Sequence, residues 1–248
     1  MATASLMSRR AVEASLGVPR GSFELLEDFF RPLPSLGAHP RHVVGWLRRA
    51  GIRRGAKILD VGCGKGAVSV AAACALGCLV EGVDAHPGFV REAELRARGR
   101  RVQSRCTFRC GLAEQIRGNF DAVVVLNLFP FEKAVHLARA RTRPGGVYLF
   151  DDAVSDDPIG GFPLVEEVDH FVRRTGDRVL ARRVWTPAEV LRRERRNLTR
   201  LKRHARTLAA ARPRDAEVFR ECLARYEAGM NKLCGPAHPA CWLVRKSR

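Results

Sequence analysis

The spacing of hydrophobic positions changes near residue 57, and the change separates two kinds of predicted structure. Before it, residues 22–30 and 42–49 carry apolar side chains at helical spacing, and three prolines interrupt the chain between them. We therefore predict a helical entry or lid segment over residues 1–50, ahead of the main sheet.

From residue 57 to residue 151, short apolar runs alternate with amphipathic stretches. The predicted strands are 57–61, 79–84, 105–110, 120–126 and 146–151, and the predicted helices are 66–76, 87–98, 113–117 and 131–141. Strands that alternate with helices indicate βαβ units, a parallel sheet and right-handed crossovers. Residues 51–153 are therefore the predicted Rossmann-like core.

After residue 152 the regular alternation stops. Residues 158–163 look like a loop, 187–211 and 214–230 are predicted helices, and 241–245 form a short β-prone run that returns to the sheet. We interpret 154–248 as a helical cap plus a terminal strand. The predicted fold is a doubly wound, mostly parallel seven-stranded α/β sheet with helices on both faces, forming one structural domain overall.

Composition places the chain among globular proteins: 46% of its 248 residues are hydrophobic and 28% are charged. It contains no run of about 18 apolar residues and no secretory signal pattern at its start. The eight cysteines lie mostly inside predicted strands and helices, which indicates reduced thiols. We expect a cytoplasmic protein with no membrane partner.

The net charge of +18 attracts polyanions, so nucleic acid is a possible partner. The arginines are spread along the chain from Arg9 to Arg248, however, and a compositional bias of the source genome would also give that distribution. We therefore do not favour nucleic acid.

The strongest chemical signal is the segment 58–66, ILDVGCGKG, in which an apolar strand runs into a glycine-rich turn that opens a helix. Gly62 and Gly64 lack the Cβ atoms that would keep a ligand from the backbone, and Gly66 allows close packing of helix and strand. Glycine can serve any tight strand-to-helix turn, so this turn alone does not identify a nucleotide site.

A second signal follows the next predicted strand. Asp84 ends that strand about 20 residues after the glycines, where a carboxylate can accept hydrogen bonds from both hydroxyls of a ribose. A dehydrogenase would share this order of elements, but Asp60 puts a negative charge where its pyrophosphate would bind. The pattern therefore favours a nucleoside without a pyrophosphate.

These residues resemble class I, Rossmann-like S-adenosylmethionine-dependent methyltransferases, whose glycine motif appears here as LDVGCGKG. The resemblance covers residues 57–152 and implies S-adenosylmethionine as methyl donor and S-adenosylhomocysteine as product. It implies that Asp60 and Gly62 help to place the methionine part of the cofactor, with the backbone around Gly64 beside it. We expect Lys65 to be a solvent-exposed residue of the first helical turn.

Two further strands match the family, and one position departs from it. The strand 120–127 and the turn Pro144-Gly145-Gly146 match the family's fourth strand and its turn into the fifth. Leu112 stands where the family often has an acid that meets the adenine amino group, although Ala113 can still supply backbone contact. The cofactor-binding residues that we predict are Asp60, Gly62, Cys63, Gly64, Asp84, Ala85, Ala113 and Asn127.

Methyl transfer is an in-line displacement that depends mainly on alignment and exclusion of water, so a catalytic residue is not obligatory. If the acceptor must lose a proton, Asp151 and His170 are the candidate general bases. Alternatively, Asp151 and Asp152 cap a turn or pair with arginines, and His170 packs in a helix. Cys234, His238 and Cys241 lack a fourth ligand, so we predict no metal site.

We favour a methyltransferase that acts on a small-molecule acceptor, because no added RNA-binding module is visible. One alternative is an RNA methyltransferase whose arginine-rich helix, 192–212, grips phosphates. The other is a non-catalytic binding protein that keeps the fold. The sequence leaves a monomer and a homodimer equally open.

Overall fold

The computed structural model describes residues 6–37, 39–157, 161–235 and 237–248. Residues 158–160 of the predicted loop 158–163 lie outside the described residues. The described residues fall into two compact units, which we describe separately. One unit comprises Met1–Pro34, Ala153–Leu164 and Val184–Pro239, and the other comprises Ser35–Asp152, Val165–Arg183 and Ala240–Arg248.

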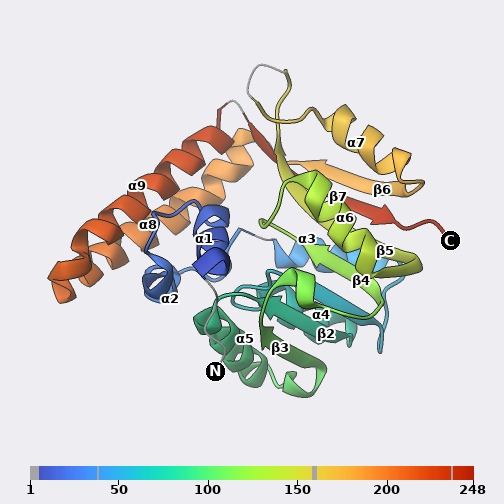
Figure 1. Ribbon diagram of the computed structural model, residues 1–248, viewed down its shortest axis with the longest axis horizontal. Coiled ribbons are helices and arrows are strands. Elements are labelled where there is room, and N and C mark those ends of the chain that lie inside the picture. Colours follow the sequence, from blue (N-terminus) through green and yellow to red (C-terminus); the bar gives the residue numbers. More distant parts are fainter. Residues whose placement is uncertain (1–5, 38, 158–160, 236) are drawn as a thin grey trace. The chain divides into compact units, whose positions relative to one another are not determined.

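The described residues form a seven-stranded sheet with the strand order β3-β2-β1-β4-β5-β7-β6 (Figure 1). The strands are β1 (Lys57–Val61), β2 (Leu79–Asp84), β3 (Cys106–Cys110), β4 (Phe120–Val125), β5 (Thr142–Val154), β6 (Arg178–Val184) and β7 (His238–Arg245). The first five strands pair in parallel. Gly145 and Gly146 exchange backbone hydrogen bonds with Lys246, just after β7. This arrangement confirms the predicted doubly wound, mostly parallel sheet.

The strand order fixes where a ligand can bind. β1 lies between β2 and β4, with Leu59 opposite Glu81 on one side and Val123 on the other. The chain therefore reverses its direction of winding at β1 and β4, and open parallel sheets bind ligands beyond the carboxyl ends of the strands at such a point.

The helices of the second unit connect these strands. They are α3 (Pro40–Arg49), α4 (Ala67–Leu76), α5 (Pro87–Gly99), α6 (Phe131–Arg141) and α7 (Val165–Arg174), with the short 3-10 helices η2 (Gln103–Arg105) and η3 (Ala113–Gln115). α4 and α5 contact β2, and α6 contacts β4. The predicted helix 113–117 is a single 3-10 turn, so its predicted type was wrong.

The alternation of helices and strands also continues past residue 152, contrary to the sequence prediction. α7 and β6 follow β5, and β6 is the edge strand beyond β7. β6 contains three arginines and has no fully buried residue, so it lacks the apolar run by which a central strand is recognised. β7 begins three residues earlier than predicted, and its Trp242 stacks on Phe150 with ring centroids 5.2 Å apart.

The first unit is mainly helical. It contains α1 (Leu6–Ser15), η1 (Phe23–Leu25), α2 (Leu26–Phe30), α8 (Pro187–Ala211), η5 (Pro213–Asp215) and α9 (Ala216–Leu233). α8 and α9 run side by side as a helical hairpin (Figure 1). Thr186 and Glu189 form a capping box at the start of α8, where Pro187 is the first helical residue. No helix in the described part of the chain is long and apolar enough to span a membrane.

Candidate functional site

The glycine turn between β1 and α4 has the backbone conformation that its sequence requires. Gly62, Gly64 and Gly66 have φ angles of +68°, +49° and +69°, which residues other than glycine rarely adopt. The amides of Gly62 and Cys63 donate to the Val83 carbonyl at 2.8 and 3.1 Å. A Cβ on Gly66 would lie 2.8 Å from the Cβ of Ala93. The turn is therefore held against β2, and α5 packs directly on it.

Asp84 lies at the carboxyl end of β2, where its side chain faces this turn. Its Oδ2 accepts a hydrogen bond from the Gly64 amide and its Oδ1 accepts one from the His86 amide, both at 2.8 Å. Burial raises the pKa of the Asp84 carboxyl, and the two amide bonds oppose that rise. The carboxylate is thus fixed beside the glycine turn by backbone donors.

His86 is a structural residue that sequence reasoning missed. It is 3% exposed, and its Nδ1 accepts hydrogen bonds from the amides of Gly88 and Phe89 at the start of α5. Its ring also lies 4.3 Å from that of Phe89. A histidine directly before a proline at the start of a predicted helix is the available signal, because that position is the N-cap.

Asp60 is a buried acid at the end of β1. It is 5% exposed, and its Oδ2 accepts a hydrogen bond from the Ser69 hydroxyl on α4. Burial raises the pKa of Asp60 to about 6; its bonds to Ser69 lower it, and the negative charge of Asp84 adds to the rise. The Cys63 thiol is also buried, beside Gly82, and burial raises its pKa well above the usual value.

Lys65 corrects a sequence prediction. Its side chain is 1% exposed and its Nζ pairs with Glu92 Oε2 of α5 at 2.9 Å, so it is not a solvent-exposed residue. The glycines on either side bring the turn close to α5, and Glu92 is the acid on α5 that meets the ammonium group. Sequence reasoning missed this pair because its partners lie on different elements and no local spacing connects them.

Asp151 and Asp152 at the end of β5 both accept hydrogen bonds from the connection between β4 and α6. Asp151 Oδ1 accepts from the Asn127 amide at 2.7 Å, and Asp152 Oδ2 accepts from the Phe131 amide at 2.8 Å. Asn127 itself has a φ of +53°, a left-handed conformation that is uncommon outside glycine. The alternative from the sequence, in which Asp151 and Asp152 cap a turn, therefore holds for at least one carboxylate oxygen of each residue.

The segment 35–37 lies against the same turn and the same connection. A Cβ on Gly37, whose φ is +88°, would lie 2.7 Å from the side-chain amide of Asn127. The Leu36 side chain would lie 3.4 Å from a Cβ on Gly64, and the Leu128 side chain would lie 3.0 Å from one on Gly62. These side chains form an apolar wall over the glycine turn.

The remaining predicted residues are not joined to this cluster by any interaction that we identify among the described residues. Ala113 is buried at the start of η3, and Ala85 is partly exposed after β2. His170 is exposed on α7, whose buried residues are Val168, Asp169 and Val172.

The soft ligands near the end of the chain do not form a metal cluster. His238 Nε2 lies 3.2 Å from Asp156 Oδ2 within the first unit, and Cys241 is buried in β7. No group of three or more His, Cys, Asp or Glu side chains in the described ranges is arranged to hold a metal ion.

Comparisons with known proteins agree with this geometry. Residues 58–146 match a family model described as a methyltransferase domain. The chain is 38% identical over 102 residues to a ubiquinone biosynthesis O-methyltransferase of Idiomarina loihiensis, a match that covers 39% of this chain and 42% of that protein. A protein of the same name from Dechloromonas aromatica is 36% identical over 123 residues, which cover 47% of this chain and 51% of that protein. The matches thus span about half the length of these relatives.

The fold also matches a solved structure over nearly its whole length. It aligns with a methyltransferase from Thiobacillus denitrificans, solved in complex with S-adenosyl-L-homocysteine, at a TM-score of 0.74. The two sequences are 18% identical, and the alignment covers 93% of this chain and 99% of that chain.

Proposed function

We propose that this chain, whose residues 58–146 match a methyltransferase-domain family model, is a class I, Rossmann-like S-adenosylmethionine-dependent methyltransferase that transfers a methyl group to a small-molecule acceptor. The observation that supports this most directly is the placement of Asp84. Its carboxylate lies at the carboxyl end of β2 and is hydrogen-bonded to Gly64 of the glycine turn, where the ribose of a nucleoside cofactor would meet both groups.

The residues of the turn fit the cofactor chemically. S-adenosylmethionine carries its methyl group on a positively charged sulfur. The acceptor atom would attack the methyl carbon in line, the carbon–sulfur bond would break, and S-adenosylhomocysteine would leave. Asp60 and Asp84 provide two carboxylates near the glycine turn, and a bound cation would favour their ionised forms. We assign Gly62, Cys63 and Gly64 to the methionine end through their backbone, and Asp84 and Ala85 to the ribose.

The rest of the site would orient the reactants and exclude water. We assign Asn127, fixed by Asp151, to the cofactor side of the connection after β4, and Leu36 and Leu128 to the apolar wall over the turn. Ala113 stays assigned to the adenine by the family resemblance alone. Asp151 and His170 remain the predicted general bases, and of the two only Asp151 lies at the carboxyl end of a strand.

A small-molecule acceptor is supported by the names of the curated relatives, both of which methylate an oxygen in ubiquinone biosynthesis according to those names. We extend the small-molecule class to this chain, and hydroxyl compounds are the first acceptors to screen. A cytoplasmic location is part of the proposal, because all eight cysteines are free thiols and the cytoplasm keeps thiols reduced.

The test is release of S-adenosylhomocysteine, measured by mass spectrometry, from S-adenosylmethionine and a library of hydroxylated aromatic and aliphatic compounds. We expect at least one acceptor to raise product above the acceptor-free rate, and Asp84→Ala to abolish the increase. Asp215→Ala is the matched control, since this acid is the N-cap residue before α9 and its side chain makes no cap bond. Tight cofactor binding without transfer to any acceptor would instead support the non-catalytic alternative.

A further inference from the structure

The outer face of α8 carries a row of arginines. Six arginines of this helix are exposed: Arg192, Arg195, Arg196, Arg200, Arg203 and Arg206. With about 100° and 1.5 Å per residue, they occupy an arc of about 140° and a length of about 21 Å. Thr199 is the other residue of that arc between the first and last arginine. We name this surface the arginine face.

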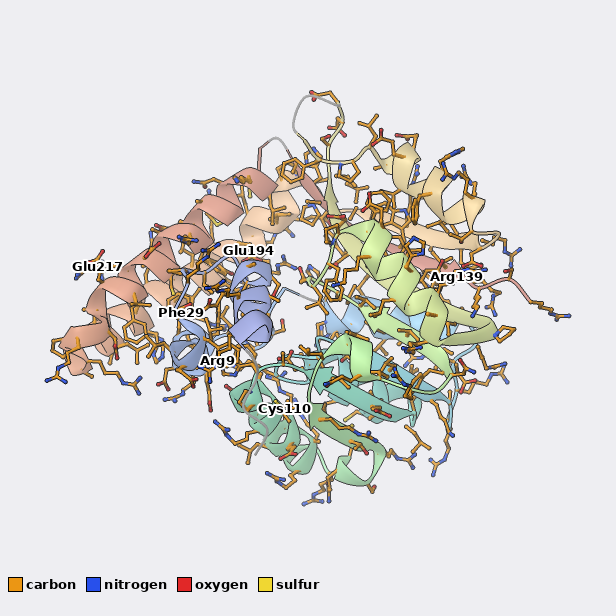
Figure 2. The ribbon with its side chains drawn as sticks, viewed as in Figure 1. Arg9, Phe29, Cys110, Arg139, Glu194 and Glu217 are labelled. Atoms are coloured by element: carbon orange, nitrogen blue, oxygen red, sulfur yellow. The ribbon has the colours of Figure 1, made fainter. Side chains whose placement is uncertain are left out.

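The charges of the arginine face are not neutralised within the described part of the chain. None of the six side chains forms an ion pair or hydrogen bond there. The two acids of α8 are engaged elsewhere: Glu189 belongs to the capping box with Thr186, and Glu194 is buried. Glu194 (Figure 2) accepts hydrogen bonds from Arg193, Asn197 and Tyr226, and the last lies on α9.

The neighbouring helix α9 differs from α8 in how its charged residues are paired. Each of its three acids is paired: Glu217 with Arg220, Glu221 with Arg225, and Glu227 with Lys202 of α8. The arginines of these two helices that have no partner among the described residues lie on the outer face of α8, while the apolar positions Leu201, Ala205 and Leu208 of that helix are buried.

We infer that the arginine face binds the phosphate backbone of double-stranded nucleic acid, independently of base sequence and of the methyl acceptor. Six guanidinium groups over about 21 Å have an average rise of about 4.2 Å from one arginine to the next, of the same order as the roughly 3.4 Å per phosphate along one duplex strand. Arginine also matches phosphate with paired donors, which lysine does not. The helix fixes these groups in a row, as a backbone with regular charge spacing requires.

Two other polyanions fit the arginine face less well. A membrane-surface helix inserts apolar side chains, but the exposed large hydrophobic residues in the described chain are Leu79, Leu95 and Val184, none of them on α8. Single-stranded nucleic acid is held partly by stacking on aromatic side chains, and α8 contains no Phe, Tyr or Trp.

The test uses the whole protein and fluorescence anisotropy with a labelled 20-base-pair RNA duplex of arbitrary sequence, over a series of salt concentrations. The test variant is Arg196→Gln/Arg200→Gln/Arg203→Gln. The control variant, Arg53→Gln/Arg98→Gln/Arg100→Gln, removes three exposed arginines of the other unit and so makes the same change in net charge. Circular dichroism and thermal melting of each variant check that the fold is kept.

We expect the test variant to bind the duplex at least tenfold more weakly than the control at low salt. Each lost phosphate contact should also make the dependence of log K on log salt shallower by about 0.9. Equal weakening in both variants would overturn the inference, because it would mean that only net charge matters. Binding to anionic phospholipid vesicles or to single-stranded RNA in preference to the duplex would overturn it as well.

Discussion

The glycine turn beside Asp84 and the outer face of α8 differ in the sign and the surroundings of their charged groups. Around the turn, acids are the exceptional groups: Asp60 is buried, and Asp84 and Asp151 accept hydrogen bonds from backbone amides. On the arginine face of α8, the six arginines are exposed and have no acidic partner among the described residues. This comparison agrees with the two proposals: the first region would receive the cofactor among groups that are already fixed, whereas the second would offer its charge to a partner outside the chain.

Among the changes that compare the two regions, removal of the Lys65 cation beside the glycine turn should have the largest effect on stability. Lys65→Met leaves Glu92 beside a buried position without its ammonium partner, and breaking such a pair costs about 3–5 kcal/mol. We expect a loss of about 3 kcal/mol in the free energy of unfolding, measured with urea, because Glu92 keeps some exposure. The double variant Lys65→Met/Glu92→Leu should recover most of it, and a double variant as unstable as the single one would contradict the account.

Replacement of the buried acid Asp60 in the glycine-turn region should change how stability depends on pH. The pKa of Asp60 is raised to about 6 in the fold and is about 4 in the unfolded chain. As pH rises, the unfolded chain therefore loses this proton at a lower pH than the folded protein does. The free energy of unfolding should fall by up to about 3 kcal/mol as pH rises from about 4 to about 6. Urea unfolding of the wild type and of Asp60→Asn should diverge over that window. A difference that stays constant with pH would show that Asp60 ionises normally.

The place of the segment 35–37 in the site can be tested with a matched pair of glycines. Gly37 and Gly51 have φ angles of +88° and +89°, so alanine strains the backbone equally at both. Only at Gly37 would the new Cβ meet a side chain, that of Asn127, since nothing lies within 4 Å of the Gly51 position. We expect Gly51→Ala to lose about 1 kcal/mol of stability and Gly37→Ala to lose more, because the Asn127 side chain must shift. We expect Gly37→Ala alone to bind S-adenosylmethionine about fivefold more weakly by calorimetry. Equal affinities would remove the segment 35–37 from the site.

The smallest effect should follow from a single change on the arginine face. Arg200 is exposed and unpaired within the described residues, so Arg200→Gln should change the free energy of unfolding by less than about 0.5 kcal/mol. Thermal melting provides the measurement. A clear loss of stability would mean that the arginine has a structural partner, and it would weaken the contrast with Lys65.

The parts of the fold that were predicted from sequence are those with strong local signals. β1, β2 and α6 have the predicted bounds, and α8 does as well, since Pro187 starts it and Thr186 and Glu189 cap it. β6 was missed because an arginine-rich edge strand lacks an apolar run.

In the candidate site, local sequence motifs identified Asp60, Asp84 and the glycines as candidate cofactor-binding residues. Lys65 was misjudged and the segment 35–37 was not connected to the turn, because both depend on contacts across the fold. Such contacts join residues from separate elements and leave no periodic trace in the sequence.

The central claim is that the carboxyl edge of β1 and β2 binds S-adenosylmethionine through Asp84. Calorimetric titration of the wild type, Asp84→Ala and Asp215→Ala with S-adenosylmethionine and S-adenosylhomocysteine tests it most directly. We predict saturable binding of both compounds to the wild type and to Asp215→Ala, and at least a hundredfold weaker binding to Asp84→Ala. A folded wild-type protein that binds neither compound, or an Asp84→Ala variant that binds both as tightly as the wild type, would contradict the account.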